Sequence, residues 1–299
     1  MSRNTSRIGM FALALVLLGL LAGCGGDKVN YFKNDGSYCV PEPDSRTEDC
    51  YVGNGPTRGA FRVTSTADLE TICTSECKKI HALEVDGTGM DGLKNLKAFQ
   101  GLTIVGSAWI TRNSNLKSTE GLHLQDGTSL YIDQNPSLET VYGLEDVVTA
   151  KTIDINFNPN VETIHGLDNF EELLNQKEAD GEQIQNKLHI ARTKVSSLHD
   201  LDGLELNEGS TFRISYNSNL ERIPEISGGK VGSVLINDNN SLTDIEGLRG
   251  IDALYQLEVA GNSSLKNCHI QDVIDGIERW GPDITRKMYV ADNSSASCD

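Results

Sequence analysis

The chain has 299 residues, with 43 acidic and 26 basic side chains and a formal net charge of −17 at pH 7. A surface this acidic repels nucleic acid and anionic lipid headgroups, which excludes binding to either through charge. We therefore expect no nucleic-acid partner.

The first 23 residues have the pattern of an export signal. Arg3 and Arg7 precede the apolar run Ile8–Leu21, which is too short for a membrane span of about 20 residues. Small residues then lead into Cys24, and the string LAGC resembles the lipobox of bacterial lipoproteins. This resemblance implies cleavage before Cys24 and lipidation of that cysteine. The alternative is an ordinary secretory signal followed by a coincidental cysteine.

Lipidation of Cys24 implies attachment to a membrane of the cell envelope. Gly25, not Asp, follows Cys24, and in diderm bacteria this pattern resembles lipoproteins sent on to the outer membrane. Residues 24–58 are polar and rich in glycine, so we interpret them as a tether with a small disulfide collar. We expect the remaining residues, 59–299, to form the folded domain.

Six further cysteines indicate disulfide bonds, because an even number in an exported protein is typical of them. These are Cys39, Cys50, Cys73, Cys77, Cys268 and Cys298. Pairing between neighbours in the sequence predicts the bonds Cys39–Cys50, Cys73–Cys77 and Cys268–Cys298, the second of them strained by its short spacer. A metal site is not expected, since the chain has no CxxC pair and no His at ligand spacing from a Cys.

One pattern recurs through most of residues 59–299: an apolar anchor, an Asn three residues later, and a Leu or Val three residues after that. The copies are Ile110-Asn113-Leu116, Ile132-Asn135-Leu138, Ile155-Asn158-Val161, Ile214-Asn217-Leu220, Ile236-Asn239-Leu242, Val259-Asn262-Leu265 and the partial copy Val290-Asn293. Ile190 begins a copy in which Thr193 replaces the Asn, and Val63 and Val85 fit loosely. Successive anchors from Ile110 lie 22, 23, 35, 24, 22, 23 and 31 residues apart.

A unit of this length cannot bury its own apolar face, whereas stacked units share a continuous core. The anchor and the residue two before it are both apolar, as in Leu130 and Ile132, which predicts a short strand with one buried face. Stacked copies then form a parallel sheet. We expect the Asn side chains to point inward at a corner and form a ladder; the alternative is a surface Asn that favours a turn.

With these residues in view, the chain resembles the receptor L-domain-like, leucine-rich-repeat-related proteins, in particular bacterial lipoproteins with such repeats. The string I-x-x-N-x-x-L-x-x-[IV]-x-G-L carries the resemblance, which covers residues 59–297. It implies a mainly β fold, a right-handed parallel β-solenoid of about 23 residues per coil, that binds other molecules and catalyses nothing. The segment Ala60–Cys77 resembles the family's first coil, a strand followed by a short helix. An insertion at Glu171–Gln185 departs from the pattern.

At the other end, the segment His269–Trp280 has apolar residues at helical spacing. A solenoid needs a cap over the open end of its core, so this segment is expected to be a capping helix.

Motifs of enzymes and cofactor sites are weak in this chain, so we expect no catalytic residue, cofactor or metal. The string GTGMDG at Gly87–Gly92 lacks the long helix of a dinucleotide site, and DINFN at Asp154–Asn158 lacks the glycine and glutamate of a calcium loop. The alternative is a β-helix polysaccharide lyase or hydrolase, acting through Asp133, Asp154 or Glu258.

Ligand binding is expected on the outer face of the sheet. The residues just before the anchors point outward: Trp109, Tyr131, Asp154, His189, Arg213, Leu235, Glu258 and Tyr289. Those just after the anchors do the same: Thr111, Asp133, Asn156, Ala191, Ser215 and Asn237. Exposed Trp and Tyr dominate binding energy at interfaces. The predicted ligand-binding set is Trp109, Thr111, Tyr131, Asp133, Asp154, Asn156, His189 and Arg213.

The partner of this surface is expected to be a protein or glycan, bound by a monomer. The alternatives are a purely structural spacer of the envelope, and a solvated sheet with two incidental aromatic residues.

Overall fold

A computed structural model describes residues 41, 48–50, 60–90, 92–174, 176–177, 183–184, 186–277, 279–280 and 287–296. All of them belong to the compact unit Tyr31–Asp299. The expected signal peptide, the lipidation site Cys24, and the cysteines Cys39 and Cys298 lie outside the described residues.

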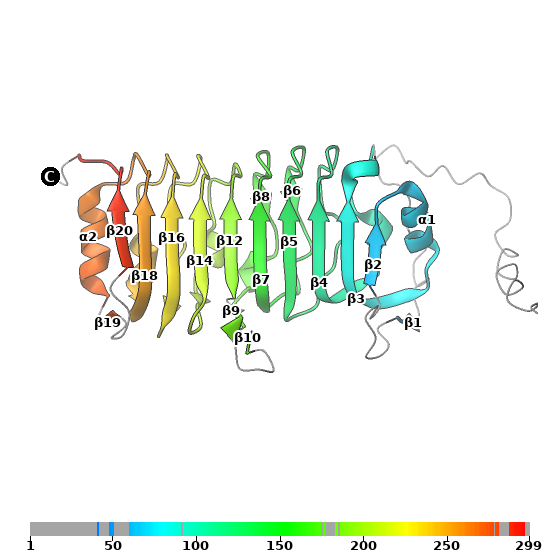
Figure 1. Ribbon diagram of the computed structural model, residues 1–299, viewed down its shortest axis with the longest axis horizontal. Helices are drawn as coiled ribbons and strands as arrows, with labels where there is room; N and C mark the ends of the chain where they lie inside the picture. Colours follow the sequence, from blue (N-terminus) through cyan, green and yellow to red (C-terminus); the bar gives the residue numbers. More distant parts are fainter. Residues whose placement is uncertain are drawn as a thin grey trace, which may run out of the picture. The chain divides into compact units, whose positions relative to one another are not determined.

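The fold is mainly β, and successive repeats form neighbouring parallel strands (Figure 1). Most strands belong to one 16-stranded sheet. Its broad face, which we call the main face, consists of β2 (Ala60–Val63), β3 (Cys77–Asp86), β4 (Thr103–Thr111), β5 (Thr128–Asp133), β7 (Thr149–Asn156), β12 (Lys187–Ala191), β14 (Thr211–Ser215), β16 (Val231–Asn237), β18 (Ala253–Ala260) and β20 (Lys287–Ala291). This confirms the mainly β fold class and is consistent with a parallel β-solenoid.

The register of the main face follows the sequence repeat. Each anchor lies opposite the anchor of the next coil, in the series Val85, Ile110, Ile132, Ile155, Ile190, Ile214, Ile236, Val259 and Val290. Every anchor except the terminal Val290 is buried. The coil that begins with Ile190 is as regular on this face as its neighbours, although the sequence before it is longer.

Short elements complete the coils behind the main face. Four strands of the same sheet pair in the order β9 (Glu172–Leu173), β13 (Leu204–Glu205), β15 (Ile226–Gly228) and β17 (Gly250–Ile251). A separate parallel pair is β6 (Thr140–Val141) with β8 (Thr163–Ile164). Single 3₁₀ turns are η1 (Gly87–Gly89), η2 (Lys97–Phe99), η3 (Leu167–Asn169), η4 (His199–Leu201) and η5 (Glu246–Arg249). Their buried Leu, Ile and Phe side chains form one continuous core with the anchors.

The repeated Asn residues form the inward ladder that the sequence predicts. Asn135 Oδ1 accepts hydrogen bonds from the backbone N–H and from Nδ2 of Asn113, at 3.0 and 2.9 Å. Asn135 Nδ2 donates to the carbonyl of Ile110 at 2.9 Å. The same backbone N–H to Oδ1 bond recurs in the pairs Asn135–Asn158, Asn217–Asn239, Asn239–Asn262 and Asn262–Asn293. Thr193 interrupts the series, and both its N–H and its hydroxyl donate to Asn217 Oδ1.

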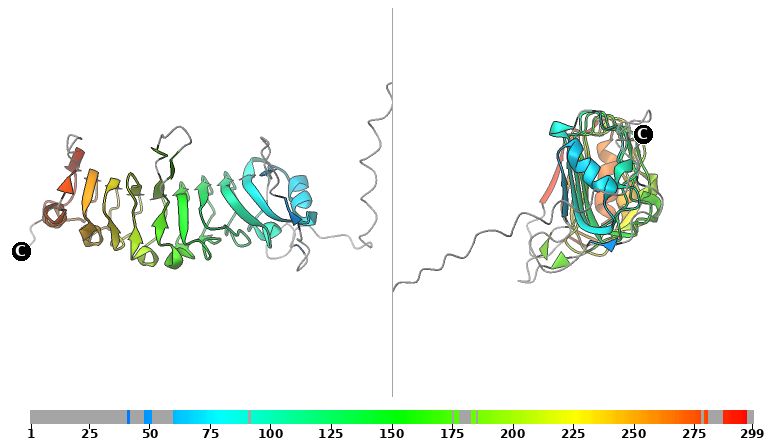
Figure 2. Two further views of the ribbon diagram at one scale, coloured as in Figure 1. Left: turned by 90° about the horizontal axis from the view of Figure 1, so that it is seen from below. Right: turned by 90° about the vertical axis from the view of Figure 1, so that its right-hand side faces the viewer.

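Most of the described residues of the insertion lie in short strands. Glu172 and Leu173 form β9, which pairs with β7 and β13 and is a normal part of its coil. The extra residues include β10 (Gln176–Lys177) and β11 (Gln183–Ile184), which pair antiparallel. This hairpin stands out from the row of coils immediately before β12 (Figure 2).

Both ends of the core are covered by helices. The helix α1 (Thr66–Thr74) follows β2, as expected, and buries Leu69 and Ile72. The helix α2 (Asn267–Gly276) buries Ile270, Val273 and Ile274. The predicted capping helix is confirmed, but its bounds differ from His269–Trp280: the helix begins two residues earlier and stops at Gly276, a poor helix former. Trp280 belongs instead to the short strand β19 (Arg279–Trp280), which pairs with β18.

Two of the expected disulfide pairings are wrong, because Cys50 is bonded to Cys77. The short strand β1 (Glu48–Asp49) pairs with β3 and places Glu48 opposite Cys77. The Cα atoms of Cys50 and Cys77 are therefore only 5.3 Å apart, a normal spacing for a disulfide. Distance along the sequence was a poor guide here, since strand pairing closes a loop between residues 27 positions apart.

The other described cysteines, Cys73 and Cys268, are also disulfide-bonded. The bond Cys268–Cys298 stays a prediction, because Cys298 lies outside the described residues.

Candidate ligand-binding face

The outward residues that precede the anchors form one continuous row across the main face. Strand register places them opposite one another in the order Glu84, Trp109, Tyr131, Asp154, His189, Arg213, Leu235, Glu258 and Tyr289. Arg62 on β2 extends the row beyond Glu84. The sequence therefore identified which side chains are neighbours on this surface, which we call the outward row.

The outward row contains a pair of stacked aromatic rings. Trp109 on β4 and Tyr131 on β5 lie with their ring centroids 5.5 Å apart and their planes within 4° of parallel. Trp109 keeps 37% of its surface exposed. A flat, partly exposed aromatic pair offers a large contact area at low entropic cost, which suits a binding surface.

Asp154 lies at the centre of the row and is held by two neighbours. Its carboxylate forms ion pairs with Lys187 Nζ and with His189 Nδ1, and the His189 Nδ1 atom lies 2.9 Å from Asp154 Oδ1. Burial of the Asp154 carboxyl tends to raise its pKa, but the hydrogen bonds from His189 and Lys187 outweigh burial and hold the pKa below the usual value. Asp154 is therefore an ionised acceptor at neutral pH and not a proton donor.

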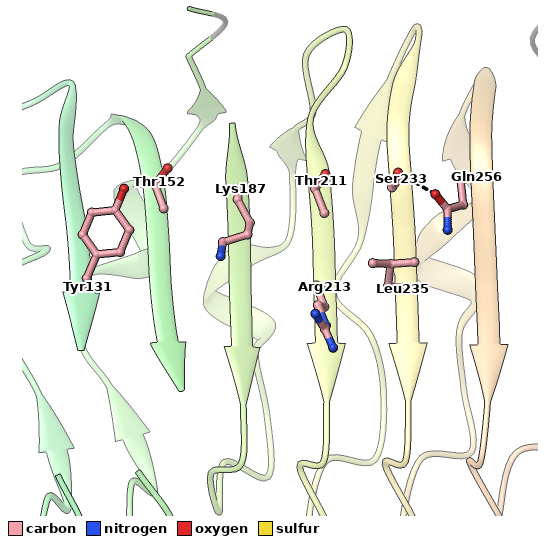
Figure 3. A pocket seen from close by; sticks show the side chains of 8 residues that line it. All are labelled: Tyr131, Thr152, Lys187, Thr211, Arg213, Ser233, Leu235 and Gln256. Atoms are coloured by element: carbon pink, nitrogen blue, oxygen red, sulfur yellow. Dashed lines mark hydrogen bonds between the residues drawn. The ribbon is translucent and has the colours of Figure 1, made fainter. Parts of the chain in front are cut away.

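An open depression of about 530 Å³ lies on the main face beside the aromatic pair. We call it the sheet depression. Figure 3 shows the side chains that line it, which come from β5, β7, β12, β14, β16 and β18: Tyr131, Thr152, Lys187, Thr211, Arg213, Ser233, Leu235 and Gln256. Its volume is within the range of small-molecule binding sites.

Sequence reasoning found three members of the sheet depression, Tyr131, Arg213 and Leu235, and missed the other five. These five are Thr152, Lys187, Thr211, Ser233 and Gln256, each three residues before an anchor. Side chains two apart on a strand share a face, so the period of two that identified the outward row also places these residues beside it.

Not every predicted outward residue is accessible. His189 is 6% exposed, and its Nε2 has no hydrogen-bond partner within the described part of the chain. In the second set, Ala191 and Ser215 are fully buried, contrary to expectation. Thr111, Asp133, Asn156 and Asn237 are partly exposed. Fewer side chains are therefore exposed on the main face at β12 and β14 than the sequence predicts.

A second exposed group lies at the corner beside the main face. The residue two after each anchor from Ile110 onward has a left-handed backbone, and at three successive coils these residues are Phe157, Arg192 and Tyr216. The Arg192 guanidinium lies 4.1 Å from the Phe157 ring centroid and 4.5 Å from that of Tyr216. Both rings are 45% exposed. Sequence reasoning missed this stack, although its spacing from the anchors is constant.

The three carboxylates considered for a polysaccharide lyase or hydrolase, those of Asp133, Asp154 and Glu258, are not paired with one another on this face. Asp154 lies opposite Tyr131, whereas Asp133 lies opposite Asn156 in the neighbouring row. Asp133 accepts from Gln134 Nε2 at 2.7 Å, and Glu258 accepts from Asn237 at 2.8 Å. Each of the three carboxylates therefore has its own partner, and no two of them face each other across a common substrate position.

Within the described residues, no group of three or more His, Cys, Asp or Glu side chains could hold a metal ion. None of the helices that the structure describes combines the length and the apolar character needed to cross a membrane. Comparison with models of protein families, with curated proteins and with solved structures found no match for the chain.

Proposed function

We propose that this protein is a non-catalytic recognition lipoprotein of the cell envelope, related to the receptor L-domain-like repeat proteins, that binds a glycan or protein through the main face. The observation that supports this most is the stacked pair Trp109–Tyr131 beside the sheet depression. The inward residues next to these rings, Ala108, Ile110, Leu130 and Ile132, are apolar and belong to the core, whereas the outward side chains are not needed for the core.

The chemistry of the face also favours recognition over catalysis. Tyr131 and Arg213 are residue types that dominate binding energy when they are placed centrally. Asp154 is held ionised, and Asp133 is engaged in a different row. An acid–base enzyme needs two groups whose pKa values are split across one substrate.

The experiment that tests binding is an array of glycans and surface proteins probed with the purified protein. A recognition protein retains at least one of these probes, and a spacer retains none. Turnover of a retained polysaccharide would identify the lyase or hydrolase alternative instead.

The anchor is tested separately by the variant Cys24→Ala. If Cys24 is acylated, this variant is released from membranes or keeps its signal peptide, whereas the wild type fractionates with the envelope. Ser37→Ala, another change in the predicted N-terminal tether region, should leave fractionation unchanged. Membrane association of Cys24→Ala equal to that of the wild type would exclude the lipid anchor.

A further inference from the structure

The charge of the sheet depression is opposite to that of the chain as a whole. The protein carries 43 acidic and 26 basic side chains, yet two cations, Lys187 and Arg213, and no carboxylate line the depression. The acidic surface around the depression repels anions, whereas the cations that line the depression attract them. The depression is therefore the part of this face that favours a negatively charged group.

The two cations are not equivalent. Lys187 Nζ is paired with Asp154, so much of its charge is already balanced. Arg213 makes one weak hydrogen bond, from Nε to Ser215 Oγ at 3.4 Å, and no ion pair with any carboxylate that the structure describes. The guanidinium of Arg213, which lines the depression (Figure 3), is therefore left with N–H donors that no carboxylate of the described residues occupies, and with about one unbalanced positive charge.

The remaining lining fits a sugar. Four hydroxyl groups come from Thr152, Thr211, Ser233 and Tyr131, and Gln256 adds an amide that accepts from Ser233 at 3.4 Å. These groups can donate and accept hydrogen bonds along a ring that carries several hydroxyls. The Tyr131 ring, extended by the stacked Trp109, gives an apolar surface at one end.

We propose that the sheet depression binds a carboxylated sugar residue, with its carboxylate on Arg213 and its hydroxyls on the Thr and Ser side chains of neighbouring strands. This inference rests on the proposed function and names its ligand class. The planar fork of a guanidinium matches a carboxylate with two parallel hydrogen bonds. A single unbalanced cation suits one negative charge per sugar, whereas a densely sulfated chain would be repelled by the acidic surface around the site.

The test is calorimetric titration of the full-length protein with oligosaccharides that contain galacturonic, glucuronic or sialic acid, each beside its methyl ester. We expect at least one acid to bind about tenfold or more tightly than its ester. Arg213→Gln should remove that difference. Arg249→Gln is the matched control, because Arg249 lies on η5, behind the main face and outside the depression. Circular dichroism checks that both variants fold.

The outcomes separate this inference from the proposed function. Equal binding of acid and ester, or an affinity for the acid that Arg213→Gln does not change, would overturn the carboxylate site while binding by the main face stands. Binding of none of the acids, with an array ligand still retained, would do the same. An Arg213-dependent preference for a sulfated oligosaccharide over every carboxylated one would also overturn it. Loss of all binding, including to the array, would count against both.

Discussion

At the scale of single residues, the Asn of each repeat solves a problem that the fold creates. Backbone groups turn inward where a strand ends at a corner, and buried N–H and C=O groups without partners are costly. The side chain of Asn239 satisfies two of them: its Oδ1 accepts from the N–H of Asn217, and its Nδ2 donates to the carbonyl of Ile214. The sequence predicts this role because the Asn has a fixed distance from the anchor.

We predict that Asn239→Ala lowers the free energy of unfolding by about 2–4 kcal/mol, because it leaves a buried donor and a buried acceptor without partners. Asn240→Ala is the matched control. Asn240 is exposed and, among the residues that the structure describes, accepts one long hydrogen bond, from Ser263 at 3.4 Å, so its replacement should cost less than about 0.5 kcal/mol. Urea denaturation of the two variants compares them, and similar losses would exclude the ladder as a source of stability.

Asp86, at the end of β3, gives a prediction about pH. The hydrogen bonds from Arg112, and after them those from Thr88, hold the pKa of Asp86 well below its usual value. A carboxyl whose pKa is depressed in the folded state stabilises the fold above the unfolded pKa of about 3.9. That contribution is lost as the pH falls from there through the folded pKa.

Asp86→Asn should therefore destabilise the protein most at neutral pH, and the difference from the wild type should shrink below about pH 4. Asp272→Asn, at an exposed position on α2, controls for the change in net charge. Denaturation curves at pH 7, 4 and 2.5 test this. A difference that is constant over the whole range would show that Asp86 acts through packing and not through its charge.

At the scale of elements, periodicity predicted the strands of the main face and their order, because every anchor except the terminal Val290 is buried and each lies opposite the anchor of the next coil. The stacking of coils also explains why a glycine recurs in the repeated Gly-Leu pair: a side chain there would collide with the preceding coil. Gly166 has φ +85°, and a Cβ there would lie 2.4 Å from the backbone N of Glu145 in the preceding coil. The β10–β11 hairpin, the end of α2 and the pairing of Cys50 depend on contacts that occur once, so no repeat could indicate them.

The fold predicts that peptide mapping without reductant recovers a Cys50–Cys77 peptide, since β1 brings Cys50 beside β3. A recovered Cys39–Cys50 or Cys73–Cys77 peptide would contradict this pairing. The bond closes a loop over a sequence separation of 27, which in the chain-entropy model contributes roughly 3–4 kcal/mol of stability. The double variant Cys50→Ser with Cys77→Ser should unfold at correspondingly lower denaturant concentration.

At the scale of the whole molecule, the repeat produces a flat face on which side chains from separate coils become neighbours. The sequence indicated this face and its row of outward residues because every second residue of a strand points the same way. It could not indicate which of them are covered, as His189 is, or that Lys187 and Arg213 share a depression with Tyr131. Those facts depend on the size and pairing of neighbouring side chains and not on the period.

The most direct test of the central claim is the affinity of two double variants for a ligand retained on the array. Trp109→Ala with Tyr131→Ala removes the stacked pair on the main face, and Phe157→Ala with Tyr216→Ala removes two exposed rings at the corner. Binding through the main face predicts a loss of about 2 kcal/mol or more for the first variant, roughly 30-fold in Kd, and less than a twofold change for the second. An unchanged Kd for Trp109→Ala with Tyr131→Ala, in protein with a native circular dichroism spectrum, would contradict it.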